Sequence, residues 1–337
     1  MPSRRRAGST SEPAAVSGAP ALAAALAEVG RVVRDAVLAV PPSRADAAVS
    51  RVAGGDEVFG VDARADRVLV AELEARCGAA WPGDLVIEGF DAPVAIGGGG
   101  PWRYLADPVD GTRPWLAGKR SAWILLGAGR AATTLEDLEV GAAVELPTRR
   151  ARLARVAWAA RGAGVEALDE DLSGAHPPTG VPLRPRRGDD LRRAWVTVAR
   201  FSPGQKGAIG AWEDDVLRGL EVYEDPYLCS GGQLMGLASG EDAAVLDPRP
   251  LFGAPLCAHP YDLAALVVAR EAGVLVEAIP PGPLQVALDP TLDVAWAGYA
   301  DPTVAVALRA RMEAVGDGAG EVRAPRATPG PRRAGTG

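Results

Sequence analysis

Two aspartates, Asp107 and Asp110, are separated by only two residues in the hexapeptide Asp107-Pro108-Val109-Asp110-Gly111-Thr112. Repulsion raises the pKa of at least one of two neighbouring carboxylates unless a cation lies between them. Carboxylate and carbonyl oxygens are the ligands that hard divalent cations prefer, and Gly111 allows the backbone to approach a ligand closely. The hexapeptide therefore indicates a divalent-metal site. On these residues alone, a polar turn with an Asp N-cap is the alternative.

The hexapeptide resembles the D-P-[IVL]-D-G-T signature of the inositol monophosphatase family, a group of magnesium-dependent, lithium-sensitive phosphatases. A second segment, Ala258–Leu266 followed by Glu271-Ala272-Gly273, is similar to the family pattern W-D-x-A-A…E-A-G, with Tyr261 in place of Trp. The residues from Arg113 to Trp123 resemble a separate bacterial branch, which reads D-G-T-R and then K-R-x-A-W, rather than the true inositol phosphatases.

Upstream residues also fall on family positions. Arg51, Asp56 and Asp62 stand where the family has a basic residue and two aspartates, although Lys is usual in place of Arg51. The resemblance implies that Asp62 forms a hydrogen bond with Thr112 and helps to polarise the attacking water. On local sequence alone, Asp62 is an N-cap of a helix over residues 63–77.

Leu85–Phe90 predicts a buried strand that carries one carboxylate, Glu88. The family has Gly-Glu-Glu here, and its first Glu is a metal ligand. Gly89 stands at the second acidic position, which leaves a further, weaker metal site in doubt.

The resemblance implies a magnesium site with two or three ions, inhibited by lithium, in which a metal-activated water attacks the phosphate ester directly. Asp107 would bridge two ions, and Thr112 with Asp62 would act on the water. The amides of Gly111 and Thr112 would bind phosphate oxygens. The implied metal ligands are Glu88, Asp107, the Val109 carbonyl, Asp110 and Asp262.

Two further groups of residues are candidates for binding the substrate. Ser230, Gly231 and Gly232 begin a predicted helix, and exposed amides at a helix N-terminus attract anions. Close backbone packing is the alternative. Arg113, with Lys119-Arg120, places positive charge just after the hexapeptide. These residues are either surface cations or ligands for a second anionic group on the substrate.

Composition limits the partners. The 337 residues carry a net charge of −7, which argues against a general nucleic-acid-binding protein. We find no apolar run of the roughly 18 residues that a membrane span requires. The three cysteines form neither a disulfide framework nor a zinc pattern, so a reducing cytoplasm is the expected location. The expected partners are a small phosphorylated metabolite and a second copy in a homodimer.

The resemblance implies a mixed α+β or α/β protein with the layered αβαβα fold of the sugar phosphatases. An antiparallel N-terminal sheet and a smaller mixed C-terminal sheet are each expected to pack against helices. Residues 92–100 are expected to form a flexible loop, and Asp262 to begin a helix as its N-cap. We expect disordered tails at 1–18 and 317–337, a metal-binding domain at 19–187 and a second domain at 188–316.

A non-catalytic regulator that binds metal or a phosphorylated ligand is the competing functional class. Gly89 and Tyr261 favour it, whereas retention of all the implied ligands favours an enzyme. A nucleotide-binding oxidoreductase, which the glycines at 97–100 would suit, is excluded because no helix follows them with dinucleotide-binding geometry.

Overall fold

The computed structural model describes residues 18–41, 43–53, 56–201 and 204–316, and the side chains of residues 51–57 lie outside that description. Arg51 and Asp56 therefore stay predictions. Apart from Gly18, both predicted tails also lie outside the described residues. The predicted domain boundary at 187/188 falls between β10 (Thr179–Gly180) and β11 (Trp195–Val198), and it stays a proposal.

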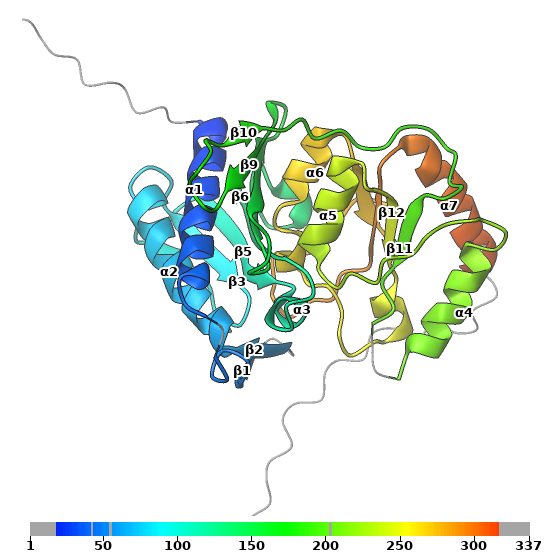
Figure 1. Cartoon of the computed structure of the whole chain (residues 1–337), viewed down its shortest axis with the longest axis horizontal. Helices are drawn as coiled ribbons and strands as arrows, with labels where there is room; N and C mark the ends of the chain where they lie inside the picture. Colours follow the sequence, from blue (N-terminus) through cyan, green and yellow to red (C-terminus); the bar gives the residue numbers. More distant parts are fainter. Residues whose placement is uncertain (1–17, 42, 54–55, 202–203, 317–337) are drawn as a thin grey trace, which may run out of the picture.

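The described residues form five layers, which run from left to right in Figure 1. Helices α1 (Ala19–Leu38) and α2 (Gly60–Cys77) cover the outer face of a large sheet. Between this sheet and a smaller one lie α5 (Ser230–Ser239) and α6 (Leu266–Ala272). The outer face of the smaller sheet is covered by α4 (Lys206–Val216) and α7 (Pro302–Gly316). The predicted αβαβα layering is confirmed.

The large sheet has the strand order β10-β9-β8-β7-β6-β5-β3-β4. All neighbouring strands are antiparallel except β3 and β5, so the expected antiparallel sheet contains one parallel pair. Besides β10, its strands are β3 (Gly83–Ile87), β4 (Val94–Ile96), β5 (Trp102–Asp110), β6 (Ala122–Arg130), β7 (Val140–Leu146), β8 (Leu153–Ala160) and β9 (Gly164–Asp171).

The smaller sheet has the order β11-β12-β14-β13 and is mixed, as expected, because only β11 and β12 are parallel. Its other strands are β12 (Asp242–Asp247), β13 (Leu275–Ala278) and β14 (Trp296–Tyr299). Shorter elements complete the described chain: a hairpin of β1 (Val49–Ala53) and β2 (Asp56–Phe59), α3 (Thr112–Leu116), and the 3₁₀ turns η1 (Leu135–Asp137), η2 (Arg249–Phe252) and η3 (Pro260–Leu263).

The prediction of a flexible loop at residues 92–100 is wrong. Val94–Ile96 forms β4, which pairs with Gly83–Leu85 at the edge of the large sheet. The three glycines at 97–99 then turn the chain at positive φ, and the Gly97 amide donates to the Glu74 carboxylate of α2 at 2.7 Å. The chain thus returns to β5, parallel to β3.

The described residues form three hydrophobic cores between the layers. One lies between α1, α2 and the large sheet, a second holds α5 and α6 between the two sheets, and a third lies under α4 and α7. In the described part of the chain, no helix combines the length and the apolar character that crossing a membrane demands.

A buried ionic cluster ties α1 to the far edge of the large sheet. The Glu170 carboxylate of β9 accepts from Arg31 Nε at 2.6 Å and from Arg34 Nη1 at 2.7 Å. Arg34 is 4% exposed, so it depends on its carboxylate partners for compensation of its charge.

We expect Glu170→Ala to lower the free energy of unfolding by about 2–3 kcal/mol, because it leaves the Arg34 guanidinium buried beside a single remaining acid. Urea unfolding followed by circular dichroism measures the change. The matched control is Asp190→Ala, which removes the exposed partner of Arg192 and should leave stability unchanged. Equal effects of the two substitutions would contradict the argument.

Candidate metal centre and active site

The register of the large sheet places Glu88 beside Asp107. Strands β3 and β5 are parallel, with Ile87 opposite Ala106, and the Glu88 amide continues the pairing to the Ala106 carbonyl at 3.2 Å. The next residue on each strand is therefore an acid. Both acids line one cavity at the carboxyl ends of these strands.

A bulge in β5 brings Asp107 and Asp110 together. Residues three apart in a regular strand point to opposite faces of the sheet. In β5, however, Asp107 is opposite Leu125 and Asp110 is opposite Trp123, so β5 has one more residue than β6 over this stretch. The extra residue restores a common face, which is how bulges re-aim side chains.

Asp262 approaches the same point from η3. Gly127 of the large sheet allows this approach, since a Cβ there would lie 2.3 Å from the Ala264 carbonyl oxygen. One carboxylate oxygen from each of Asp107, Asp110 and Asp262 lies within 4.8 Å of the others. The structure thus gathers three of the implied ligands, and Glu88 lines the same cavity.

The prediction that Asp262 begins a helix as its N-cap is wrong. It is the third residue of η3, and its Oδ2 accepts from the backbone amide of His259 at 2.6 Å. Helix α6 begins four residues later, at Leu266. The carboxylate therefore reaches back toward the chain that precedes it.

The N-cap alternative for Asp62 is also wrong, because Asp62 is the third residue of α2 and its Oδ2 accepts from the Phe59 amide at 2.8 Å. Its Oδ1 accepts from the Thr112 hydroxyl at 3.0 Å, so the hydrogen bond implied by the resemblance is present. The same hydroxyl lies 2.7 Å from the Val109 carbonyl oxygen.

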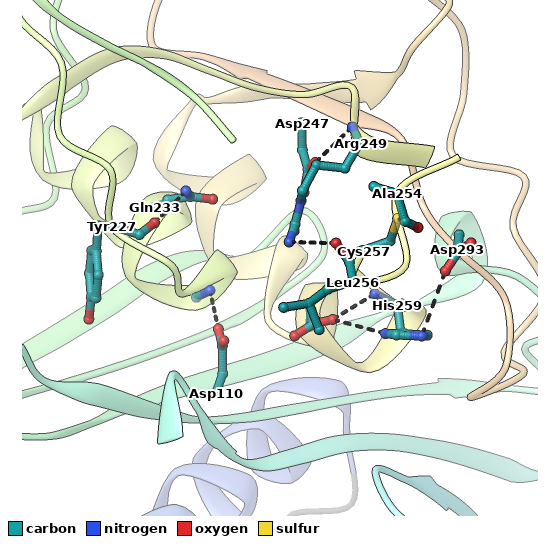
Figure 2. A network of polar contacts seen from close by, with 12 residues as sticks. Asp110, Tyr227, Gln233, Asp247, Arg249, Ala254, Leu256, Cys257, His259 and Asp293 are labelled. Carbon is teal, nitrogen blue, oxygen red and sulfur yellow. Dashed lines mark hydrogen bonds and ion pairs between the residues drawn. The ribbon is translucent and has the colours of Figure 1, made fainter. Parts of the chain in front are cut away.

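Helix α5 fixes Asp110 from the other side of the cavity. The Gly231 amide donates to Asp110 Oδ2 at 2.5 Å, and the Gly232 amide donates to Cys229 Sγ at 3.3 Å. Figure 2 marks the hydrogen bond at the Asp110 carboxylate with a dashed line. Of the predicted substrate residues at this N-terminus, Ser230 lines the cavity, whereas Gly231 and Gly232 do not. Binding of substrate by Ser230, Gly231 and Gly232 stays a prediction.

Burial and repulsion oppose ionisation at this site. Burial is the largest cause that raises the pKa of Asp107, followed by the charges of Glu88, Asp110 and Asp262. Burial, together with Asp262, raises the pKa of Asp110 to about 8, although the Gly231 amide opposes the shift. A divalent cation among these carboxylates would stabilise their charged forms, and carboxylate oxygens are ligands that hard cations prefer.

Among the described side chains, two arginines line the cavity. Arg113 lines it from α3 and lies over the ring of Phe59, with 5.3 Å from the guanidinium carbon to the ring centroid. The other is Arg249 of η2. Lys119 and Arg120 do not line it, and Arg120 instead pairs with Asp225 at 2.7 Å. Gly111 and Thr112, the predicted phosphate-binding residues, do line it.

Sequence reasoning missed Arg249, together with the apolar rim that Phe59 and Phe201 contribute. The segment Asp247-Pro248-Arg249-Pro250 gave no periodic or family signal. An aspartate two residues before an arginine was the only available indication of a local ion pair.

The fold is that of the inositol monophosphatase family. The solved structures that it resembles include Leishmania major fructose-1,6-bisphosphatase, at TM-score 0.64 and 13% identity, covering 90% of this chain and 96% of that one. They also include a Pyrococcus horikoshii protein described as similar to inositol-1 monophosphatase, at 0.62 and 15%, covering 87% and 98%. A third is the extragenic suppressor protein SuhB of Bartonella henselae, at 0.60 and 15%, covering 87% and 97%. The sequence matches no protein-family profile and no curated protein.

We expect Gly231→Ala to destabilise the fold by about 2 kcal/mol, since a Cβ there would lie 2.5 Å from Leu125 Cδ2 and 3.1 Å from the Asp110 carboxylate. The control is Gly210→Ala in α4, where the added methyl group meets nothing within 4 Å. That substitution should be neutral or slightly stabilising. Thermal and urea unfolding compare the two, and an equally stable Gly231→Ala would mean that α5 adjusts its position freely.

Proposed function

We propose that this protein is a Mg²⁺-dependent phosphomonoesterase that hydrolyses a small phosphorylated metabolite, such as a sugar, inositol or nucleotide phosphate. One observation carries the proposal: carboxylates from β5 and η3, more than 150 residues apart in the chain, lie within 4.8 Å of one another in one cavity. That the similar structures include a fructose-1,6-bisphosphatase supports it.

The donor set fits magnesium, which prefers oxygen ligands and is bound through carboxylates. Glu88, Asp107, Asp110 and Asp262, with the Val109 carbonyl, would hold two ions, or three if Gly89 does not abolish the third site. Bound Mg²⁺ would neutralise charge on the phosphoryl oxygens and lower the pKa of a water. By family resemblance, lithium would inhibit.

The chain's own groups would orient the reactants. Thr112, whose hydroxyl donates to Asp62 and lies 2.7 Å from the Val109 carbonyl oxygen, would position the attacking water. The amides of Gly111 and Thr112 would bind phosphate oxygens, and Ser230 would contact the substrate from α5. Such positioning and charge stabilisation supply most of the catalysis in phosphoryl transfer.

A non-catalytic, ligand-binding regulator with the same fold is the second candidate, favoured by Gly89 and Tyr261. Retention of every implied ligand, together with the Asp62–Thr112 hydrogen bond, weighs against it. A homodimer and a cytoplasmic location stay predictions.

We expect purified protein to release phosphate from one or more esters in a panel of sugar, inositol and nucleotide phosphates, only with Mg²⁺ and less with Li⁺ added. Asp110→Asn should reduce kcat by at least about 100-fold, because it removes a charged ligand. It should also abolish the Mg²⁺-dependent rise in melting temperature while leaving the circular dichroism spectrum unchanged. Asp289→Asn, an exposed acid outside the cavity, is the control. Wild-type activity in Asp110→Asn would contradict the assignment of Asp110 as a ligand.

Arg113 is the cation on the α3 side of the cavity. For a substrate with a second anionic group, we expect Arg113→Ala to raise KM by about tenfold and to lower kcat less, because a charged hydrogen bond contributes about 1.5–3 kcal/mol. Arg120→Ala, outside the cavity, should leave KM unchanged. Unchanged kinetics in Arg113→Ala would mean that Arg113 is only a surface cation stacked on Phe59.

A further inference from the structure

Arg249 reaches the cavity from the smaller sheet. It is the first residue of η2, two residues after β12 ends at Asp247. Its side chain is 11% exposed and lines the same cavity as Asp107 and Asp262. In Figure 2 the side chain extends from the backbone beside Asp247 toward the region between Asp110 and His259.

The Arg249 guanidinium is held in one orientation. Asp247, which is wholly buried, accepts from Nε at 2.8 Å and from Nη2 at 2.6 Å. Nη1 donates to the Leu256 carbonyl at 3.1 Å. Because a bidentate pair fixes both the plane and the direction of the guanidinium, little conformational entropy is lost when a ligand binds to it.

Two N–H groups of Arg249 remain after these contacts. A guanidinium carries five, and Asp247 and Leu256 take three, which leaves one on each terminal nitrogen. Burial alone would lower the pKa of Arg249, but the adjacent Asp247 carboxylate raises it, so the group stays charged. The remaining donors are thus permanently charge-assisted, and they suit carboxylate or phosphate oxygens.

An arginine–carboxylate pair that only stabilises the fold does not need to line the candidate site, as Arg249 does. Arg270 makes the same kind of pair elsewhere, since its two terminal nitrogens donate to the Glu136 carboxylate at 2.8 and 2.7 Å and to the Val276 carbonyl at 2.9 Å. That pair connects α6 to η1 without lining the candidate site. The Asp247–Arg249 pair differs in facing the metal-ligand carboxylates.

We propose that Arg249 is a specificity-determining residue whose remaining N–H groups bind a second anionic group, a carboxylate or a phosphate, on the alcohol part of the ester. The inference rests on the proposed function, because the metal-ligand carboxylates define where the reacting phosphate would lie. Asp247 is the positioning residue that orients Arg249. The substrate would then be held at two points, by its ester phosphate and by its second charge.

Three esters of one sugar test this inference: glucose 1-phosphate, glucuronic acid 1-phosphate and glucose 1,6-bisphosphate, which carry a neutral group, a carboxylate and a phosphate at C6. p-Nitrophenyl phosphate, which has no second anion, reports the chemistry alone. Wild-type protein with Mg²⁺ should show a kcat/KM about tenfold or more higher for the two charged sugars than for glucose 1-phosphate.

The double variant Asp247→Asn/Arg249→Gln keeps a hydrogen-bonded pair but removes both charges. We expect the preference to fall to within about twofold through KM, and turnover of p-nitrophenyl phosphate to fall less than turnover of the two charged sugars. The matched control, Glu136→Gln/Arg270→Gln, should keep the preference. Wild-type protein without a preference, a double variant that retains it, or an equal loss of p-nitrophenyl phosphate turnover would overturn the inference.

Failure of the proposed function gives a different result. If wild-type protein releases phosphate from none of the esters, the enzyme assignment fails. Calorimetric titration of the same three sugars then decides the role of Arg249, because a binding preference that the double variant loses supports it and equal binding overturns it. If the double variant does not fold, Arg249→Lys replaces it. This substitution keeps the charge but loses the bidentate geometry, and an undiminished preference would contradict the proposal.

Discussion

Among the described side chains, four carboxylates share one cavity, and their mutual repulsion is the constraint on which the site depends. Each aspartate among them is held by a backbone amide: Asp107 by Val109 at 2.9 Å, Asp110 by Gly231 at 2.5 Å and Asp262 by His259 at 2.6 Å. An amide stabilises the charged form and fixes the carboxylate without neutralising it. The acids are therefore prearranged while a strong attraction for an added cation remains.

The same local arrangement occurs at Asp62 and at Asp262. Asp62 and Asp262 are third residues of their elements, and each accepts from the amide three residues before it. One carboxylate oxygen is used for local structure, which leaves the other for a partner. At Asp62 that partner is the Thr112 hydroxyl. An aspartate at the cap position would bind only the amides of its own helix. As the third residue of the helix, Asp62 binds a preceding amide with one oxygen and the Thr112 hydroxyl with the other.

The sequence was sufficient for the family-like segments, which are local features, and for the layers, which the resemblance of those segments implied. The hexapeptide, the strand before Glu88 and the apolar runs of the central strands are contiguous in the chain. The bulge between Asp107 and Asp110 depends on pairing with β6, which no local pattern records. Strand β9 was missed because its charges, among them Glu170, obscure the alternation, and their partners lie on α1. Arg249 was missed for the same reason, since its position in the cavity is a tertiary property.

Identities of 13–15% with similar structures at TM-scores of 0.60–0.64 show how few positions this architecture requires. The amides that orient the aspartates come from the main chain, so most side chains around them are free to differ. The glycines are exceptions where backbones must meet, as Gly127 does with Ala264. Under the proposed function, phosphate chemistry would depend on the layered scaffold, whereas discrimination between alcohols would depend on side chains that enter the cavity from short segments such as η2. In this chain, Asp247 at the end of β12 orients Arg249 at the start of η2. The positive charge on this wall of the cavity therefore comes from a local ion pair and not from the fold.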